Sequence, residues 1–175
     1  MTRLVLMNIF RFVALIVLQV LMLNYVYLGG YVVPFIYILA IMMLPTRVGN
    51  IPLLLIAFVS GGLIDLFCNI PGFHAFSCTM MAFFRILFGN KMLTRDDPTE
   101  VVDTPSVHSV PFEVFAVYVL LLALVYSVTY GLLETFSLGN FGMTAISMVV
   151  NAAVTWVLVM LCQLLIKKKL LKILN

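Results

Sequence analysis

The feature that most constrains this chain is a succession of six apolar runs, most of them ended by glycine, proline, asparagine or a charged residue. Most of these runs reach the ~17 to 25 residues that a helix needs to cross a hydrocarbon core. The 175 residues are 64% hydrophobic and 10% charged, and their mean hydropathy is +1.19. Because one small water-soluble core cannot bury that much apolar surface, the sequence predicts a membrane protein.

The runs predict helices and not the strands of a barrel, because they lack the alternation of polar and apolar residues that barrel strands show. We therefore expect an all-α integral membrane protein that forms a single transmembrane domain over residues 1–175. The second run is short and begins near Pro34, so on length alone it also fits a re-entrant segment. The six transmembrane helices are expected at about residues 12–28, 32–44, 51–67, 73–91, 112–136 and 141–166.

The distribution of basic residues favours six spans over five. With six spans, the outer connections near residues 29, 69–71 and 138–140 contain no lysine or arginine. The positive-inside rule then places both termini in the cytoplasm. Five spans would move the four C-terminal lysines outside. The basic residues that share the cytoplasmic side are Arg3, Arg11, Arg47, Lys91, Arg95, Lys167, Lys168, Lys169 and Lys172.

Three polar segments flank the runs. Arg3 and Arg11 also fit a signal peptide, but no small-residue cleavage site follows them, so we expect an uncleaved first span. Residues 94–111 are rich in acidic residues and proline and predict a flexible cytoplasmic loop. The C-terminal lysines alternate with leucine and isoleucine, which fits an amphipathic turn on anionic lipids or a stop-transfer signal.

Polar side chains inside the spans are costly, so each is either functional or used in helix packing. For the uncharged Gln19, Asn151 and Thr155, we favour interhelical hydrogen bonds. Arg85 is the one basic residue within a span, where a charge at the bilayer centre costs about 2.5–3.5 kcal/mol. We expect it to face protein or to extend toward the cytoplasmic surface.

Asp65 follows Gly61 and Gly62 in the third span, and Gly61 is one helical turn away. Small residues permit close helix approach, and the carboxylate beside them is suited to accept hydrogen bonds from the turn at residues 71–74. Two roles remain open: a structural lock across the third and fourth spans, and a site that faces a partner. Arg85 lies ~16 Å along the fourth span, too far for an unstrained ion pair with Asp65.

Catalysis is not expected, and neither is a cofactor. Asp65 has no second intramembrane aspartate, Ser60 is not in a nucleophile elbow, and His74 and Ser77 have no third residue to orient them. The three cysteines form no CxxC pair and predict packing residues, with a bridge between Cys68 and Cys78 as the alternative. The basic residues are dispersed, which argues against a nucleic-acid partner.

Several short motifs, in this order over nearly the whole chain, resemble the MreD family of bacterial rod shape-determining proteins. They are Leu18-Gln19, Leu44-Pro45-Thr46-Arg47, Gly61-Gly62-Leu63-Ile64-Asp65, Pro71-Gly72-Phe73-His74-Ala75, and Val150-Asn151-Ala152 ahead of Lys167 to Lys169. The acidic loop at residues 94–111 has no clear place in this pattern. The candidate structural or partner-binding residues are Gln19, Gly61, Gly62, Asp65, Pro71, Gly72, His74, Arg85 and Asn151, and the candidate membrane-surface residues are Lys167, Lys168, Lys169 and Lys172.

The resemblance implies a non-catalytic subunit of the cell-elongation complex in the bacterial inner membrane. It implies binding to the bitopic protein MreC, and indirect association with MreB and with a glycosyltransferase–transpeptidase pair that builds peptidoglycan. Proteins similar to MreD share their fold with the six-helix substrate-capture subunits of energy-coupling-factor transporters. Since fold alone does not decide function, capture of a vitamin-like small molecule is the alternative.

Overall fold

The computed structural model describes residues 12–19, 34–93, 104–107, 109–138 and 141–174. All regular structure in these ranges is helical, which agrees with the predicted all-α class. Residues 12–19 form the described part of the expected first span, and the rest of that span lies outside the described residues. The other helices are α2 (Ile38–Met42), α3 (Asn50–Cys68), α4 (Phe73–Phe84), the π-helix η2 (Arg85–Gly89), α5 (Asn90–Leu93), α6 (Phe112–Leu138) and α7 (Phe141–Leu174).

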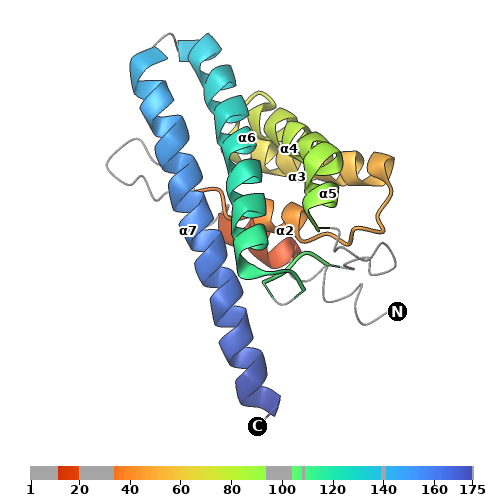
Figure 1. The fold of residues 1–175 in the computed structure, drawn as a ribbon. Coiled ribbons are helices and arrows are strands. Elements are labelled where there is room, and N and C mark those ends of the chain that lie inside the picture. Colours follow the sequence, from red (N-terminus) through yellow and green to blue (C-terminus); the bar gives the residue numbers. More distant parts are fainter. Residues whose placement is uncertain (1–11, 20–33, 94–103, 108, 139–140, 175) are drawn as a thin grey trace.

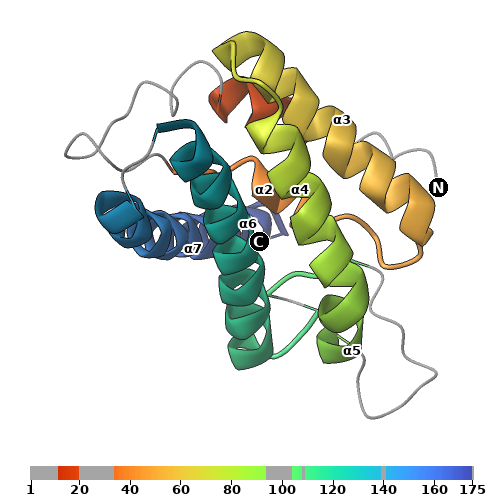
Figure 2. The ribbon, with the colours of Figure 1, turned by 90° about the horizontal axis from the view of Figure 1, so that it is seen from above.

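The long helices pack in the order α3, α4, α6, α7, each against the next, as the view from above shows (Figure 2). Helices α6 and α7 lie side by side, and α7 extends well beyond α6 toward the C-terminus (Figure 1). The short helix α2 contacts α3, α4 and α6. This arrangement places residues 34–44 between helices that come from distant parts of the sequence.

Three helices are long and apolar enough to cross a membrane: α3, the Phe112–Thr135 part of α6 and the Thr144–Leu165 part of α7. A shorter apolar helix covers Phe73–Gly89 and continues through α5 to Leu93. Large apolar side chains cover the outer surface of the long helices, with Leu66 80% and Ile51 73% exposed. Water would oppose such exposure and lipid would not, so these surfaces are consistent with a membrane protein.

The expected helix over residues 32–44 is wrong over the described part, residues 34–44, because only the five residues of α2 are helical. Five residues rise ~7 Å, far less than the ~30 Å of a hydrocarbon core. Pro34 has no N–H for a helix, and the residues around α2 bond to side chains of other helices instead. Residues 34–42 are all buried, so this irregular backbone is enclosed by protein and not by lipid.

We call residues 34–44 the central segment. Its Phe35 ring contacts His74 near the start of α4, and the carbonyl of Leu44 accepts a hydrogen bond from Arg85. His74 and Arg85 are eleven residues apart on one helix, which corresponds to ~16 Å. The central segment therefore runs beside α4 in the same direction, although most of it is not helical.

Candidate functional site

Asp65, on the last turn of α3, joins that helix to the start of α4. One carboxylate oxygen accepts a hydrogen bond from the backbone N–H of His74 at 3.0 Å, and the other accepts from that of Ala75 at 2.8 Å. The first N–H groups of a helix have no partner within the helix, and its N-terminus favours negative charge. Asp65 is 5% exposed, and its two hydrogen bonds join α3 to α4, as expected for the structural-lock role.

The turn that follows Asp65 uses two left-handed backbone positions. Asn69 has φ 56° and ends α3, and Gly72 has φ 83° and precedes α4. The N–H of Ile70 donates to the carbonyl of Asp65 at 3.0 Å, which closes the end of α3. Pro71 is exposed at the tip of this turn. Glycine at position 72 permits the backbone conformation that brings the first turn of α4 onto the carboxylate.

Of the two neighbouring glycines, only Gly61 allows the helices to approach. A Cβ added at Gly61 would lie 2.4 Å from the carbonyl oxygen of His74, whereas one at Gly62 would meet nothing within 4 Å. The close contact between α3 and α4 is therefore made at Gly61, in the position that the sequence indicated. Gly62 does not take part in this contact, because a Cβ there would meet open space.

The side chain of His74 belongs to a buried cluster of hydroxyl groups. Its Nδ1 lies 2.5 Å from Tyr126 Oη and 3.1 Å from Tyr37 Oη, and the two tyrosine oxygens are 2.6 Å apart. Tyr37 Oη also lies 3.3 Å from Cys78 Sγ. His74 is 3% exposed and the other three are fully buried, so this cluster links the central segment to α4 and α6.

The beginning of the central segment is held by side chains from both ends of the chain. Gln19 donates from Nε2 to the carbonyl of Pro34 at 3.0 Å and accepts at Oε1 from the N–H of Ile36, also at 3.0 Å. Thr155 on α7 accepts at Oγ1 from the N–H of Phe35 at 3.1 Å. Both side chains are buried, and both take the place of helical hydrogen bonds that this backbone does not make.

The other end of the central segment is held by Arg85 and Tyr118. Arg85 donates to the carbonyl of Ile41 at 2.6 Å and to that of Leu44, and Tyr118 Oη donates to the carbonyl of Met42 at 2.9 Å. Arg85 is 1% exposed, so it faces protein, as one of the two sequence-based expectations required. It binds carbonyl groups and not Asp65, which agrees with the predicted separation of the two charges.

Sequence reasoning missed Tyr37, Tyr118 and Tyr126, which are almost fully buried. A signal was present, since a tyrosine within an apolar run needs a hydrogen-bond partner once it is buried. Asn151 is also buried, on α7. No disulfide joins Cys68 to Cys78, so the alternative of a bridge is not formed in this structure. Helix α7 continues past residue 166 to Leu174, but the side chains of Lys167, Lys168, Lys169 and Lys172 lie outside the described residues.

The residues that hold the central segment bind the chain's own backbone or one another, and none of these contacts involves an ion pair. In the described ranges, no three histidine, cysteine, aspartate or glutamate residues gather closely enough to hold a metal ion. The fold and this site define an all-helical protein with an internally bonded polar core and an apolar exterior. Comparison with protein families, with curated proteins and with solved structures finds no match to this chain.

Proposed function

We propose that this chain is a non-catalytic scaffold subunit of the bacterial cell-elongation complex, similar to MreD. In this proposal it spans the inner membrane six times, with both termini in the cytoplasm, and binds the bitopic protein MreC. Through MreC it helps to position peptidoglycan synthesis, alongside MreB and the glycosyltransferase–transpeptidase pair. The basic residues on the cytoplasmic side and the family motifs support this proposal.

The observation that carries the proposal is that two of the family motifs meet where the end of α3 contacts the start of α4. We call this contact the Asp65 joint. The first motif supplies Gly61 and Asp65, and the second supplies Gly72 and His74. Together these residues fix the end of α3 against the start of α4. Their polar groups bind other groups of the same chain. Such contacts make the surface around them rigid, whereas a reaction site would keep its polar groups open to solvent. The partner then meets the outer surface that this joint shapes, and not the joint itself.

Capture of a vitamin-like small molecule is the second candidate, and one observation favours it. Polar and aromatic side chains converge near the start of α4, where the rings of Phe35, His74, Tyr126 and Tyr130 contact one another. A ligand pocket would use such groups. We favour the scaffold because the oxygens of Tyr37 and Tyr126 already bind each other and His74 in a buried cluster.

Substitution of Asp65 tests the scaffold proposal. Leucine would leave the N–H groups of His74 and Ala75 unpaired, at roughly 1–3 kcal/mol for a buried donor, whereas asparagine keeps the size and one acceptor oxygen. We expect Asp65→Leu to lower membrane abundance, MreC co-purification and rod shape more than Asp65→Asn does, in cells depleted of the native protein. The matched control is Leu66→Ala, since Leu66 is the next residue and 80% exposed.

If Asp65→Leu accumulates, binds MreC and supports rod shape as well as the parent, the joint is not needed for function and the proposal loses its main support. If Leu66→Ala lowers membrane abundance, MreC co-purification and rod shape as much as Asp65→Leu does, any substitution at the end of α3 causes the defect and the carboxylate has no special role. A defect that is confined to Asp65 is the result we predict.

A further inference from the structure

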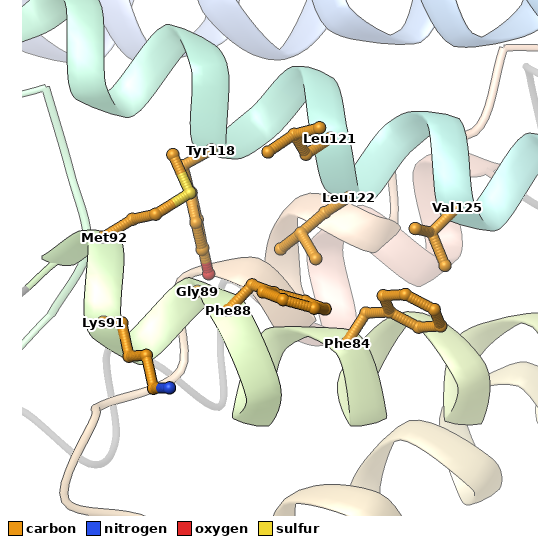
Figure 3. Close-up of a pocket in the computed structure, with 9 residues that line it drawn as sticks. All are labelled: Phe84, Phe88, Gly89, Lys91, Met92, Tyr118, Leu121, Leu122 and Val125. Carbon is orange, nitrogen blue, oxygen red and sulfur yellow. The ribbon is translucent and has the colours of Figure 1, made fainter.

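An apolar pocket of about 420 Å³ lies between the first half of α6 and the end of the continuous helical stretch Phe73–Leu93, which we call the fourth helix (Figure 3). Phe84 and Phe88 lie opposite Leu122 and Val125 in this view. The α6 residues that line the pocket belong to the part of α6 that is apolar enough to cross a membrane. Its lining residues are Phe84, Phe88, Gly89, Lys91, Met92, Tyr118, Leu121, Leu122 and Val125.

Apart from the Lys91 ammonium and the Tyr118 hydroxyl, the side chains that line this pocket offer no nitrogen or oxygen atom. A Cβ at Gly89 would lie 2.8 Å from Cε2 of Tyr118, so glycine allows the tyrosine ring to pack against the π-helix η2. The hydroxyl of Tyr118 already donates to the carbonyl of Met42. A polar ligand would therefore lose its hydration without compensation, which restricts the occupant to an apolar chain.

Lys91 is the charged residue of the lining, and its side chain is exposed. Figure 3 shows its ammonium group directed away from the two apolar rows. No acidic side chain of the described residues forms an ion pair with it. The residue lies in the last turn of the fourth helix, which ends at Leu93, and the charge pattern of the sequence places this end at the cytoplasmic surface. An occupant that satisfies both features has an apolar chain and an anionic head.

We propose that this pocket binds one acyl chain of an anionic phospholipid, with the lipid phosphate against the Lys91 ammonium. The volume falls within the ~300–1,000 Å³ of small-molecule sites. The bound lipid fills the space between α6 and the fourth helix and fixes their separation at the cytoplasmic end. This inference does not depend on the identity of the protein partner.

Native mass spectrometry of the full-length chain, reconstituted with phosphatidylglycerol or phosphatidylcholine of identical acyl chains, tests the proposal. We expect the parent to retain one phosphatidylglycerol with about fivefold preference, which corresponds to ~1 kcal/mol for one lysine near lipid phosphate. Lys91→Gln should remove this preference and still bind the acyl chain. Arg47→Gln, which changes a basic residue outside the pocket lining, should keep it.

A second pair of variants tests the acyl chain separately. Leu121→Trp fills the pocket and should release the lipid, whereas Leu120→Trp lies next to it on α6, outside the lining, and should not. Equal retention of the two lipids by the parent would overturn the proposal, and so would unchanged retention in Leu121→Trp. A photo-crosslinking side chain at position 121 should label phospholipid; if it labels a protein helix instead, the pocket is a protein-docking site and our assignment is wrong.

Discussion

Gly61 and Gly62 are adjacent and have the same chemistry, but they face different surroundings. A Cβ at Gly61 would lie 2.4 Å from a backbone oxygen of α4, and the next two nearest atoms are also backbone atoms, which cannot rotate away. A Cβ at Gly62 would meet open space. The two positions therefore separate the effect of helix contact from the effect of glycine on helix propensity.

We predict that Gly61→Ala lowers the free energy of unfolding by about 1–3 kcal/mol, because α3 and α4 must move apart. Gly62→Ala should be neutral or stabilise by roughly 0.5–1 kcal/mol, because alanine is the better helix former. Thermal unfolding of the two purified variants in the same detergent gives the comparison. Equal melting temperatures would mean that the helices do not approach at Gly61.

The contact of Asp65 with the turn at residues 71–74 could be predicted because its partners are local. His74 is nine residues from Asp65, and the intervening sequence contains turn residues. The hydrogen bonds of Tyr37 could not be predicted in this way, because its partners are distant in the sequence. His74 is 37 positions away and Tyr126 is 89 positions away. Nothing in the local pattern around Tyr37 indicates which distant side chain its hydroxyl meets.

At the scale of elements, the long helices were predictable and the central segment was not. An apolar run of sufficient length predicts a helix by itself, and α3, α6 and α7 agree with that prediction. The central segment departs from it because Gln19 and Thr155 supply partners for its backbone, from 17 and 120 residues away. Those contacts replace helical hydrogen bonds, so the local apolar pattern no longer decides the conformation.

Gln19→Leu tests this account of the central segment. The substitution leaves the carbonyl of Pro34 and the N–H of Ile36 without their partner, at roughly 1–3 kcal/mol for buried groups. We expect faster amide hydrogen exchange over residues 35–44 and a lower melting temperature. The control is Val17→Leu on the same helix, where the side chain is 47% exposed. Unchanged exchange in Gln19→Leu would show that other contacts hold the segment.

At the scale of the whole molecule, the proposed topology rests on charge and on the direction of the central segment. That segment runs from the level of His74 to the level of Arg85, as α4 does, while α3 returns in the opposite direction. An even number of crossings places the C-terminal lysines on the cytoplasmic side. The central segment must therefore be one of the six membrane crossings, although it is not a continuous helix.

We predict that a phosphatase fused after Asn175 is inactive in intact cells, because the enzyme requires export and the proposed topology keeps the C-terminus in the cytoplasm. A fusion in the turn at residues 69–72 should be active and serves as the control. Activity of the C-terminal fusion would contradict the six-span topology.

We propose that this chain serves as a scaffold for a bitopic partner. The most direct test of this proposal is purification from native membranes at endogenous expression, followed by mass spectrometry of intact complexes and of their extracted small molecules. We predict MreC in stoichiometric amount and no small ligand other than phospholipid. A stoichiometric vitamin-like ligand, together with an ATPase-linked coupling subunit and without a bitopic partner, would contradict it.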